Sequence, residues 1–531
     1  MSQAAPKSRW LDDASLQEVK AKLDNCVGNH QCDSAQNAEL PKRLLDLQVP
    51  GKSPDFIKLV KTAEIVVSPG QRVNYVALSY CWGRTTAFTT TSQSLNSRVK
   101  GFRTAEMPRT LSDTAQVARE LGYRYLWIDA LCILQEGRKD PVAAEDWRHE
   151  SARMHLIYGN ASLCIVAAGA SSSDQGLRHK DPRVIKDTGI VEWSAQGKIP
   201  IGCEPISSRA WCFQEWLLSN RLLVFASTGV YYVCDRYTLD TADPAYGFRF
   251  PKSRPGVAAI NAQATLSRDS WQTMAMNYSA RNMSEPSDKL PALSGMAKRY
   301  ADLMGWPAGD YHAGLWRATL ISDLLWSREE GLSSVSATPD PAKTGRQHGR
   351  APSWSWTSMD GSITYLTFPG GCVPRDVSIQ SCGTMKPSVK DADPFGQVVS
   401  GRLVIVAPYM TTWARPFLEE PGKLYFQLFD ANDGFVDLLT VDDPVEMDES
   451  RTNVPTSPIM TSFPRFQPAG PSNLSKGIMV HCLGLMVKQD GEQSWAGIAV
   501  RELVDKTYAR VGEFCITGFT PEKSPKEFVI V

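Results

Sequence analysis

The most continuous apolar stretch of the chain runs from Leu126 to Gln135 and carries one carboxylate, one thiol and one amide. Its short length and its Ile, Leu and Trp residues predict a central strand that is buried on both faces. An ionisable side chain in such a strand is costly unless a partner satisfies it. The polar residues of the stretch, Asp129, Cys132 and Gln135, are therefore candidates for catalytic residues.

Strands and helices are predicted to alternate around this stretch. Further strands are predicted at residues 75–80 and 163–168, with a small hairpin at 56–60 and 64–67. Apolar residues at helical spacing predict a helix from Pro108 to Gly122, with Thr110 as its N-cap, and a second helix over about residues 143–158. This order predicts a parallel sheet with right-handed crossovers.

The rest of the chain is predicted to be mainly helical at first and mainly β-strand towards its end. Residues 209–218 predict a helix, followed by a strand pair at 222–225 and 230–234, and then by helices at 290–305 and 313–326. Residues 352–356 alternate with period two and place two indoles on one face. Short strands are predicted at 403–406, 424–428, 478–485, 495–500, 508–515 and 528–531.

These patterns predict an α/β core, a helical middle region and a C-terminal antiparallel β domain, α+β overall. The predicted division is an N-terminal helix with a Cys/His turn segment at 1–56, the α/β domain at 57–235, the helical region with a linker at 236–350, and the β-rich domain at 351–531.

A functional crevice is expected outside the carboxyl ends of the parallel strands, where ligands bind to open α/β sheets. Three separate segments are predicted to meet there: Tyr80 to Trp82, Cys132 to Gln135, and Ser171 to Asp174. Tyr80, Trp82 and Leu134 are therefore predicted to contact a ligand.

Composition and charge exclude several kinds of partner. Among 531 residues, Lys plus Arg and Asp plus Glu both number 57, so nothing favours nucleic acid or an anionic membrane as a partner. No apolar segment approaches the length of a membrane span, and residues 1–7 do not resemble a signal peptide. We therefore expect a cytoplasmic protein with reduced thiols.

Each candidate side chain has a structural alternative to its chemical role. Asp129 is either a carboxylate that accepts hydrogen bonds, with Arg124 or Arg209 as donor, or a general acid or base with a raised pKa. Cys132 is either a buried apolar side chain or a nucleophile whose pKa a nearby cation would lower.

Polar and aromatic side chains elsewhere also have two interpretations. Gln135, Gln214 and Glu215 either bind a ligand or hydrogen-bond one another. The indoles either form a core or give a crevice apolar walls suited to a terpenoid or polyketide; these are Trp82, Trp211, Trp354 and Trp356.

The sequence contains no catalytic triad motif, dinucleotide fingerprint or metal-binding carboxylate cluster. Cys26, His30 and Cys32 invite a zinc interpretation, but a structural zinc site needs four ligands. We therefore expect no cofactor and no metal, and leave zinc at this cluster open.

In order along the chain, a set of motifs resembles the fungal heterokaryon-incompatibility (HET) family over nearly its full length. The motifs lie at residues 40–46, 75–83, 126–135, 154–161, 209–215, 278–279, 288–292, 313–316, 324–326 and 352–356. The resemblance implies a Toll/interleukin-receptor-like α/β core and a role in non-self recognition and cell death in filamentous fungi. It also implies a link to secondary metabolism, where some members have become cyclases.

The chain departs from the family pattern near the expected crevice. It has Leu134 where the family usually has Asn, Trp216 where a basic residue is common, and Glu136-Gly137 where two acidic residues are usual. Two of these changes replace a polar group by an apolar one. They are consistent with a site adapted to an apolar small molecule, and equally with drift on a structural surface.

Three functions follow as hypotheses. The first is a cofactor-independent cyclase or isomerase of an apolar secondary metabolite, for example one catalysing an intramolecular Diels-Alder cycloaddition. The second is an incompatibility or cell-death protein that acts through protein contacts. The third, by fold analogy alone, is a hydrolase that cleaves NAD with Glu136 or Glu215 as its carboxylate.

Overall fold

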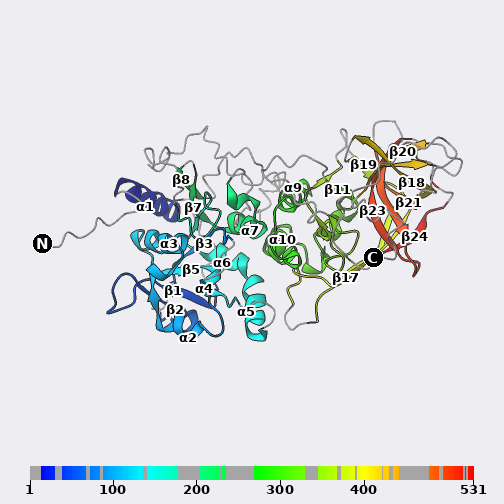
Figure 1. Cartoon of the computed structure of the whole chain (residues 1–531). Helices are drawn as coiled ribbons and strands as arrows, with labels where there is room; N and C mark the ends of the chain where they lie inside the picture. The colour runs from blue at the N-terminus through cyan, green and yellow to red at the C-terminus, as the bar shows by residue number, and fades with distance from the viewer. Residues whose placement is uncertain are drawn as a thin grey trace. The chain divides into compact units, whose positions relative to one another are not determined.

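The chain forms two compact units, residues Met1–Val257 with Pro291–Gly305 and residues Ala258–Leu290 with Trp306–Val531 (Figure 1). The computed structural model describes residues 13–29, 39–66, 72–83, 88–135, 140–177, 204–227, 229–234, 268–328, 345–366, 372–388, 392–420, 423–429, 435–441, 478–488, 494–517, 519, 521 and 524–531. The division into four parts stays a prediction.

A mixed sheet of eight strands organises the first unit. Its order is β4 (Phe102–Arg103), β2 (Phe56–Lys61), β1 (Arg43–Asp46), β5 (Tyr125–Trp127), β3 (Tyr75–Ser79), β6 (Leu163–Val166), β7 (Arg221–Ala226) and β8 (Gly229–Cys234). The central strands β5, β3, β6 and β7 run parallel, and the outer pairs are antiparallel. The predicted parallel sheet is confirmed, whereas the Toll/interleukin-receptor likeness stays a prediction.

The chain adds its next parallel strand on one side of β3 and the following one on the other side. From β3 the chain passes through helix α3 (Arg109–Glu120) to β5 on one side, and then returns to β6 on the other side. Helices α5 (Pro141–Ser151) and α6 (Met154–Asn160) make that return. Such a topological switch point opens a crevice beyond the carboxyl ends of the strands.

The predicted strand from Leu126 to Gln135 is wrong beyond its first residues. β5 ends at Trp127, and residues Asp129–Cys132 form the helical turn α4. The backbone N–H of Cys132 donates to the carbonyl of Ile128 at 2.7 Å, which closes the turn. An apolar run of this length does not distinguish a buried strand from a strand followed by a buried helical turn.

Two other predictions in this unit need correction. The segment after β2 forms a 3-10 turn at Thr62–Glu64 and Ile65 has no strand partner, so the predicted hairpin is wrong; β2 pairs with β1 instead. The predicted helix at 143–158 is two helices, because the chain turns between Ser151 and Met154. Pro108 rather than Thr110 is the N-cap of α3.

Two helices cover the sheet beside the crevice. Helix α7 (Ala210–Leu218) packs against α6, and both contact α10 (Pro291–Met304). Helix α10 belongs to the first unit, although the residues on either side of it belong to the second. The predictions of helices at 209–218 and 290–305 and of the strand pair β7 and β8 are confirmed.

The second unit is dominated by a mainly antiparallel sheet of ten strands. Six of them pair in a closed ring: β18 (Tyr409–Glu420), β19 (Lys423–Phe429), β20 (Phe435–Val441), β23 (Tyr508–Thr517), β22 (Ser494–Glu502) and β21 (Ile478–Lys488). Strands β24 (Lys526–Ile530), β17 (Ser400–Ala407) and β16 (Ser378–Met385) extend it on one side, and β15 (Cys372–Pro374) pairs with β21. The predicted C-terminal antiparallel strands are confirmed.

The predicted helix at 313–326 is wrong. This segment contains β10 (Leu315–Trp316), which pairs with β9 (Tyr311–His312), followed by the short helix α11 (Leu320–Asp323) and by β11 (Trp326–Arg328). The turn between β9 and β10 holds Ala313 at φ +49°. Its backbone is an acceptor for buried side chains, since the indole N–H of Trp271 and that of Trp356 both donate to the Gly314 carbonyl at 3.0 Å.

Glycine allows the strands of the closed ring to approach closely. A Cβ at Gly497 in β22 would collide with the carbonyl oxygen of Leu483 and lie 2.7 Å from Cζ of Phe514, whereas a Cβ at Gly383 in β16 would meet nothing within 4 Å. We therefore expect Gly497→Ala to destabilise the second unit by about 1–3 kcal/mol through overpacking. Gly383→Ala serves as the control, and equal denaturation midpoints for the two variants would contradict this packing.

Candidate functional site

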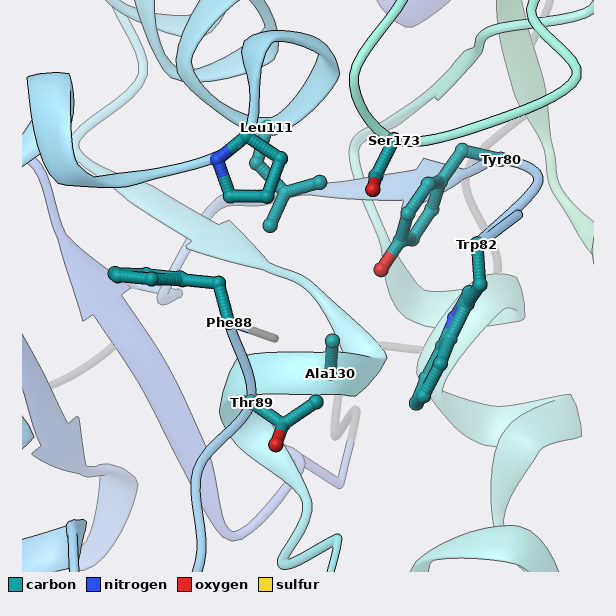
Figure 2. A pocket seen from close by; sticks show the side chains of 8 residues that line it. Tyr80, Trp82, Phe88, Thr89, Leu111, Ala130 and Ser173 are labelled. Atoms are coloured by element: carbon teal, nitrogen blue, oxygen red, sulfur yellow. The ribbon is translucent and has the colours of Figure 1, made fainter. Parts of the chain in front are cut away.

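A pocket lies at the switch point, beyond the carboxyl ends of β3, β5 and β6 (Figure 2). It is a shallow depression with about 230 Å³ of empty space, part of which is open solvent, and is lined by Tyr80, Trp82, Phe88, Thr89, Pro108, Leu111, Ala130 and Ser173. It therefore has room for a small terminal group of a ligand, and the rest of such a ligand would lie outside it.

The pocket has an apolar side and a hydroxyl-bearing side. Phe88 and Leu111 form the apolar side, and the hydroxyl groups of Tyr80 and Ser173 point into the space from the other (Figure 2). Backbone hydrogen bonds fix Ser173, whose N–H donates to the Trp82 carbonyl and whose carbonyl accepts from Thr110. A group with a hydrogen-bond acceptor on an apolar frame matches this arrangement.

Asp129 lies behind the hydroxyl-bearing side and is held by three donors. The Trp82 indole N–H donates to Oδ2 at 2.8 Å, the Ala130 backbone N–H donates to Oδ1 at 2.7 Å, and the Tyr80 hydroxyl hydrogen-bonds to the same carboxyl group. Burial nevertheless raises the pKa of Asp129, because desolvation outweighs these bonds and the charge of Arg209. Burial and the neighbouring Asp129 also raise the pKa of Tyr80, so its hydroxyl stays protonated.

A second carboxyl group, that of Glu215 on α7, is buried close to the first. It accepts a hydrogen bond from the hydroxyl of Ser79, the last residue of β3. Burial, followed by the negative charge of Asp129, raises its pKa to about 7. Glu215 does not line the pocket, so it does not contact a ligand there; its negative charge contributes to the raised pKa of Tyr80.

The guanidinium of Arg209 is the positive charge of this cluster. Arg209 is the N-cap residue of α7, and its charge acts on Asp129, Glu215 and the thiols of Cys81 and Cys212. Burial raises the pKa of both thiols, so they are neutral and poorly nucleophilic. Of the two donors predicted for Asp129, Arg209 thus lies near it, whereas Arg124 binds Asp46 at 2.8 Å.

Cys132, Leu134 and Gln135 support the site from behind and do not line the pocket. Cys132 is fully buried, and burial raises its pKa to about 12, which favours the structural alternative. Leu134 forms a bridge with Thr90, and its backbone N–H donates to Asp146. The Gln135 amide donates to the backbone carbonyl of Asp129 at 3.1 Å, so it positions the turn that carries the carboxylate.

The remaining predicted residues lie elsewhere. Trp211 packs edge-to-face against Trp147, and Gln214 is fully buried against Gly295 of α10. Trp354 and Trp356 are both fully buried and belong to the second unit, where the Trp354 carbonyl accepts from the indole of Trp326. The structure therefore does not bring these four residues into the described pocket.

Sequence reasoning missed the residues that form the apolar side of the pocket. Phe88 and Thr89 precede Thr90, whose N–H donates to the Ala130 carbonyl at 2.9 Å and whose hydroxyl donates to Leu131. No pattern in the sequence predicts these hydrogen bonds between Thr90 and α4. Pro108 and Leu111 begin a predicted helix, and Ser173 lies within a predicted segment of the sheet edge, so these three were within reach of the sequence.

The described residues contain neither a cluster of metal ligands nor a helix that could span a membrane. Among the described residues, no group of three or more His, Cys, Asp and Glu side chains is arranged to hold a metal ion. Cys26 accepts a hydrogen bond from Nε of Arg221 at 3.1 Å, whereas His30, Cys32 and Glu136 lie outside the described residues. No described helix has the length and apolar character needed to cross a bilayer.

The raised pKa of Glu215 predicts a loss of stability with rising pH. The folded chain holds a proton from the ordinary value of 4.5 up to about pH 7, while the unfolded chain releases it. Stability should therefore fall across this window by up to about 3 kcal/mol, and Glu215→Gln should remove that part of the slope. Denaturant midpoints measured across the window test this. The control Glu64→Gln alters an exposed carboxyl and should keep the wild-type slope; a wild-type slope in Glu215→Gln would refute the assignment.

Comparison with known proteins identifies part of the chain. Residues 75–215 match the family model described as heterokaryon incompatibility protein (HET). No curated protein and no solved structure matches the chain. The match contains the whole pocket wall together with Asp129, Arg209 and Glu215, but it covers part of the chain rather than nearly its full length. The chain therefore carries a HET domain at residues 75–215.

Proposed function

We propose that the HET domain is a cofactor-independent isomerase or cyclase that acts on an apolar secondary metabolite bearing a carbonyl or similar acceptor at its reacting end. One observation carries the proposal: the hydroxyl of Tyr80 points into an otherwise largely apolar pocket and is backed by the carboxyl group of Asp129. A buried carboxyl group with a raised pKa beside a pocket is typical of acid–base sites.

The chemistry depends on whether the Tyr80 hydroxyl donates its hydrogen bond to Asp129 or to the substrate. When Asp129 is protonated, it donates to the Tyr80 oxygen, and the Tyr80 hydroxyl is then free to donate to an acceptor on the substrate. The Ser173 hydroxyl offers a second donor on the same side. Two donors aimed at one carbonyl stabilise negative charge that develops on its oxygen, as in enolisation or in a cycloaddition of an activated alkene.

The apolar side contributes by orientation. Phe88, Leu111 and Ala130 hold the reacting end of the substrate against the two hydroxyl groups. Holding reacting atoms in a near-attack geometry replaces the entropy cost of an unguided cyclisation. Because the pocket is a shallow depression, the remainder of a terpenoid or polyketide would extend beyond the described wall.

The roles of Tyr80 and Asp129 can be separated. Tyr80→Phe removes the donor and should lower the rate of conversion by about 100-fold. Activity of the wild type should decrease as pH rises through the pKa of Asp129, because the ionised carboxylate then accepts the hydrogen bond of the Tyr80 hydroxyl, which is no longer available to the substrate. Asp129→Asn cannot ionise and should lose this pH dependence while keeping measurable activity.

Purified protein incubated with carbonyl-bearing polyene or terpenoid precursors, followed by chromatography and mass spectrometry, measures these rates. Asp46→Asn is the matched control, because Asp46, the last residue of β1, is also a buried carboxylate of the sheet but binds Arg124 and does not line the pocket. Conversion no faster than in buffer for the wild type, or full activity in Tyr80→Phe, would refute the proposal.

The family match favours a second candidate, an incompatibility or cell-death protein that acts through protein contacts. Expression in a filamentous fungus distinguishes it from the enzyme. If contacts carry the function, wild type and the pocket-filling variant Ala130→Leu should both arrest growth; if chemistry carries it, the variant should alter only the metabolite profile. No described feature favours NAD cleavage, since Glu215 is hydrogen-bonded to Ser79 and does not line the pocket.

A further inference from the structure

The positively charged side chain of Arg98 packs against Phe88, which lines the pocket. The guanidinium carbon of Arg98, on helix α2 (Leu95–Lys100), lies 3.9 Å from the ring centre of Phe88 and 4.8 Å from that of Phe102. The two rings contact each other edge-to-face at 5.6 Å. Stacking on two packed rings restricts a side chain that would otherwise lose much rotamer freedom on binding.

Arg98 has no acidic partner within salt-bridge distance among the described residues. Glu106 is the acidic group whose charge acts on it, yet the Glu106 carboxylate accepts from the backbone N–H of Arg103 at 2.7 Å. The Nε of Arg98 is buried without a hydrogen-bond partner in the described part of the chain. A partly desolvated guanidinium with unused donors favours a carboxylate or phosphate over water.

Arg98 lies against one wall of the pocket. Phe88 forms the apolar side of the pocket, and the guanidinium is stacked on that same ring. The pocket is a shallow depression, so most of a substrate would lie outside it. A part of the substrate that extends over the edge of Phe88 would meet the positive charge of Arg98.

We infer that Arg98 is a specificity-determining residue that binds an anionic group, a carboxylate or a phosphate, on the part of the substrate outside the pocket. This inference rests on the proposed function, since it takes the pocket as the site of the reacting end. It narrows the substrate class to amphiphilic metabolites with an apolar, acceptor-bearing end and an acidic end. The apolar end and the acidic end of such a substrate should be separated by about the width of the Phe88 ring, because Phe88 lines the pocket and Arg98 stacks on it.

Binding of phenylalkanoates of increasing chain length, each compared with its methyl ester, tests the inference. Titrations followed by tryptophan fluorescence, which Trp82 in the wall makes sensitive to occupancy, should show one chain length at which the acid binds about tenfold tighter than its ester. Arg98→Met keeps an unbranched side chain to pack on Phe88 but removes the charge, and should bind acid and ester equally. Arg98→Lys should retain part of the preference, and added salt should weaken it.

The matched control is Arg103→Met, because Arg103 is a nearby exposed arginine that pairs with Asp55. It should bind as the wild type does. If the esters bind the wild type, Ala130→Leu weakens them, and the acids gain nothing from Arg98, then the inference about Arg98 is refuted and the proposed pocket stands. If neither acids nor esters bind, the proposed pocket and this inference are both refuted. A phosphate monoester of the best chain length, binding tighter than the acid, would identify phosphate as the preferred group.

Discussion

The pocket depends on one constraint, the placement of the Asp129 carboxyl group where the chain turns from β5 into a helical turn. The turn directs the carboxyl toward the end of β3, where Trp82 and Tyr80 bind it. The same turn offers carbonyl oxygens to Thr90, which brings Phe88 and Thr89 against the opposite side of the pocket. Both walls of the site are therefore tied to a single turn of backbone.

Burial gives this arrangement its chemical character. Desolvation disfavours ionisation of both Asp129 and Glu215, the charge of Asp129 further raises the pKa of Glu215, and Arg209 compensates only part of the cost. Burying such a cluster costs stability, because the charged forms lose their hydration. Burial also raises the pKa of the neighbouring thiols of Cys81 and Cys212, so they stay neutral and poorly nucleophilic.

Much of the fold could be predicted from the sequence, because the regular spacing of apolar residues identifies long segments such as α3, α10 and the C-terminal strands. The stretch after Trp127 could not, since Ile, Leu and Cys are as suitable for a buried helical turn as for a strand. Tyr80 and Trp82 were found because strand ends converge in a parallel sheet. Phe88 was missed because its position depends on hydrogen bonds between Thr90 and the distant turn α4, which no local sequence pattern predicts.

The membership of α10 in the first unit has a consequence for how the protein is made. The first unit includes residues up to Gly305, so it cannot finish packing while the ribosome has synthesised only the chain up to Glu215, where the region matched by the HET family model ends. Until α10 emerges, the apolar surfaces of α6 and α7 lack their cover. Residues of the second unit, Ala258–Leu290, leave the ribosome before that cover arrives, so the two units are interleaved in time as well as in sequence.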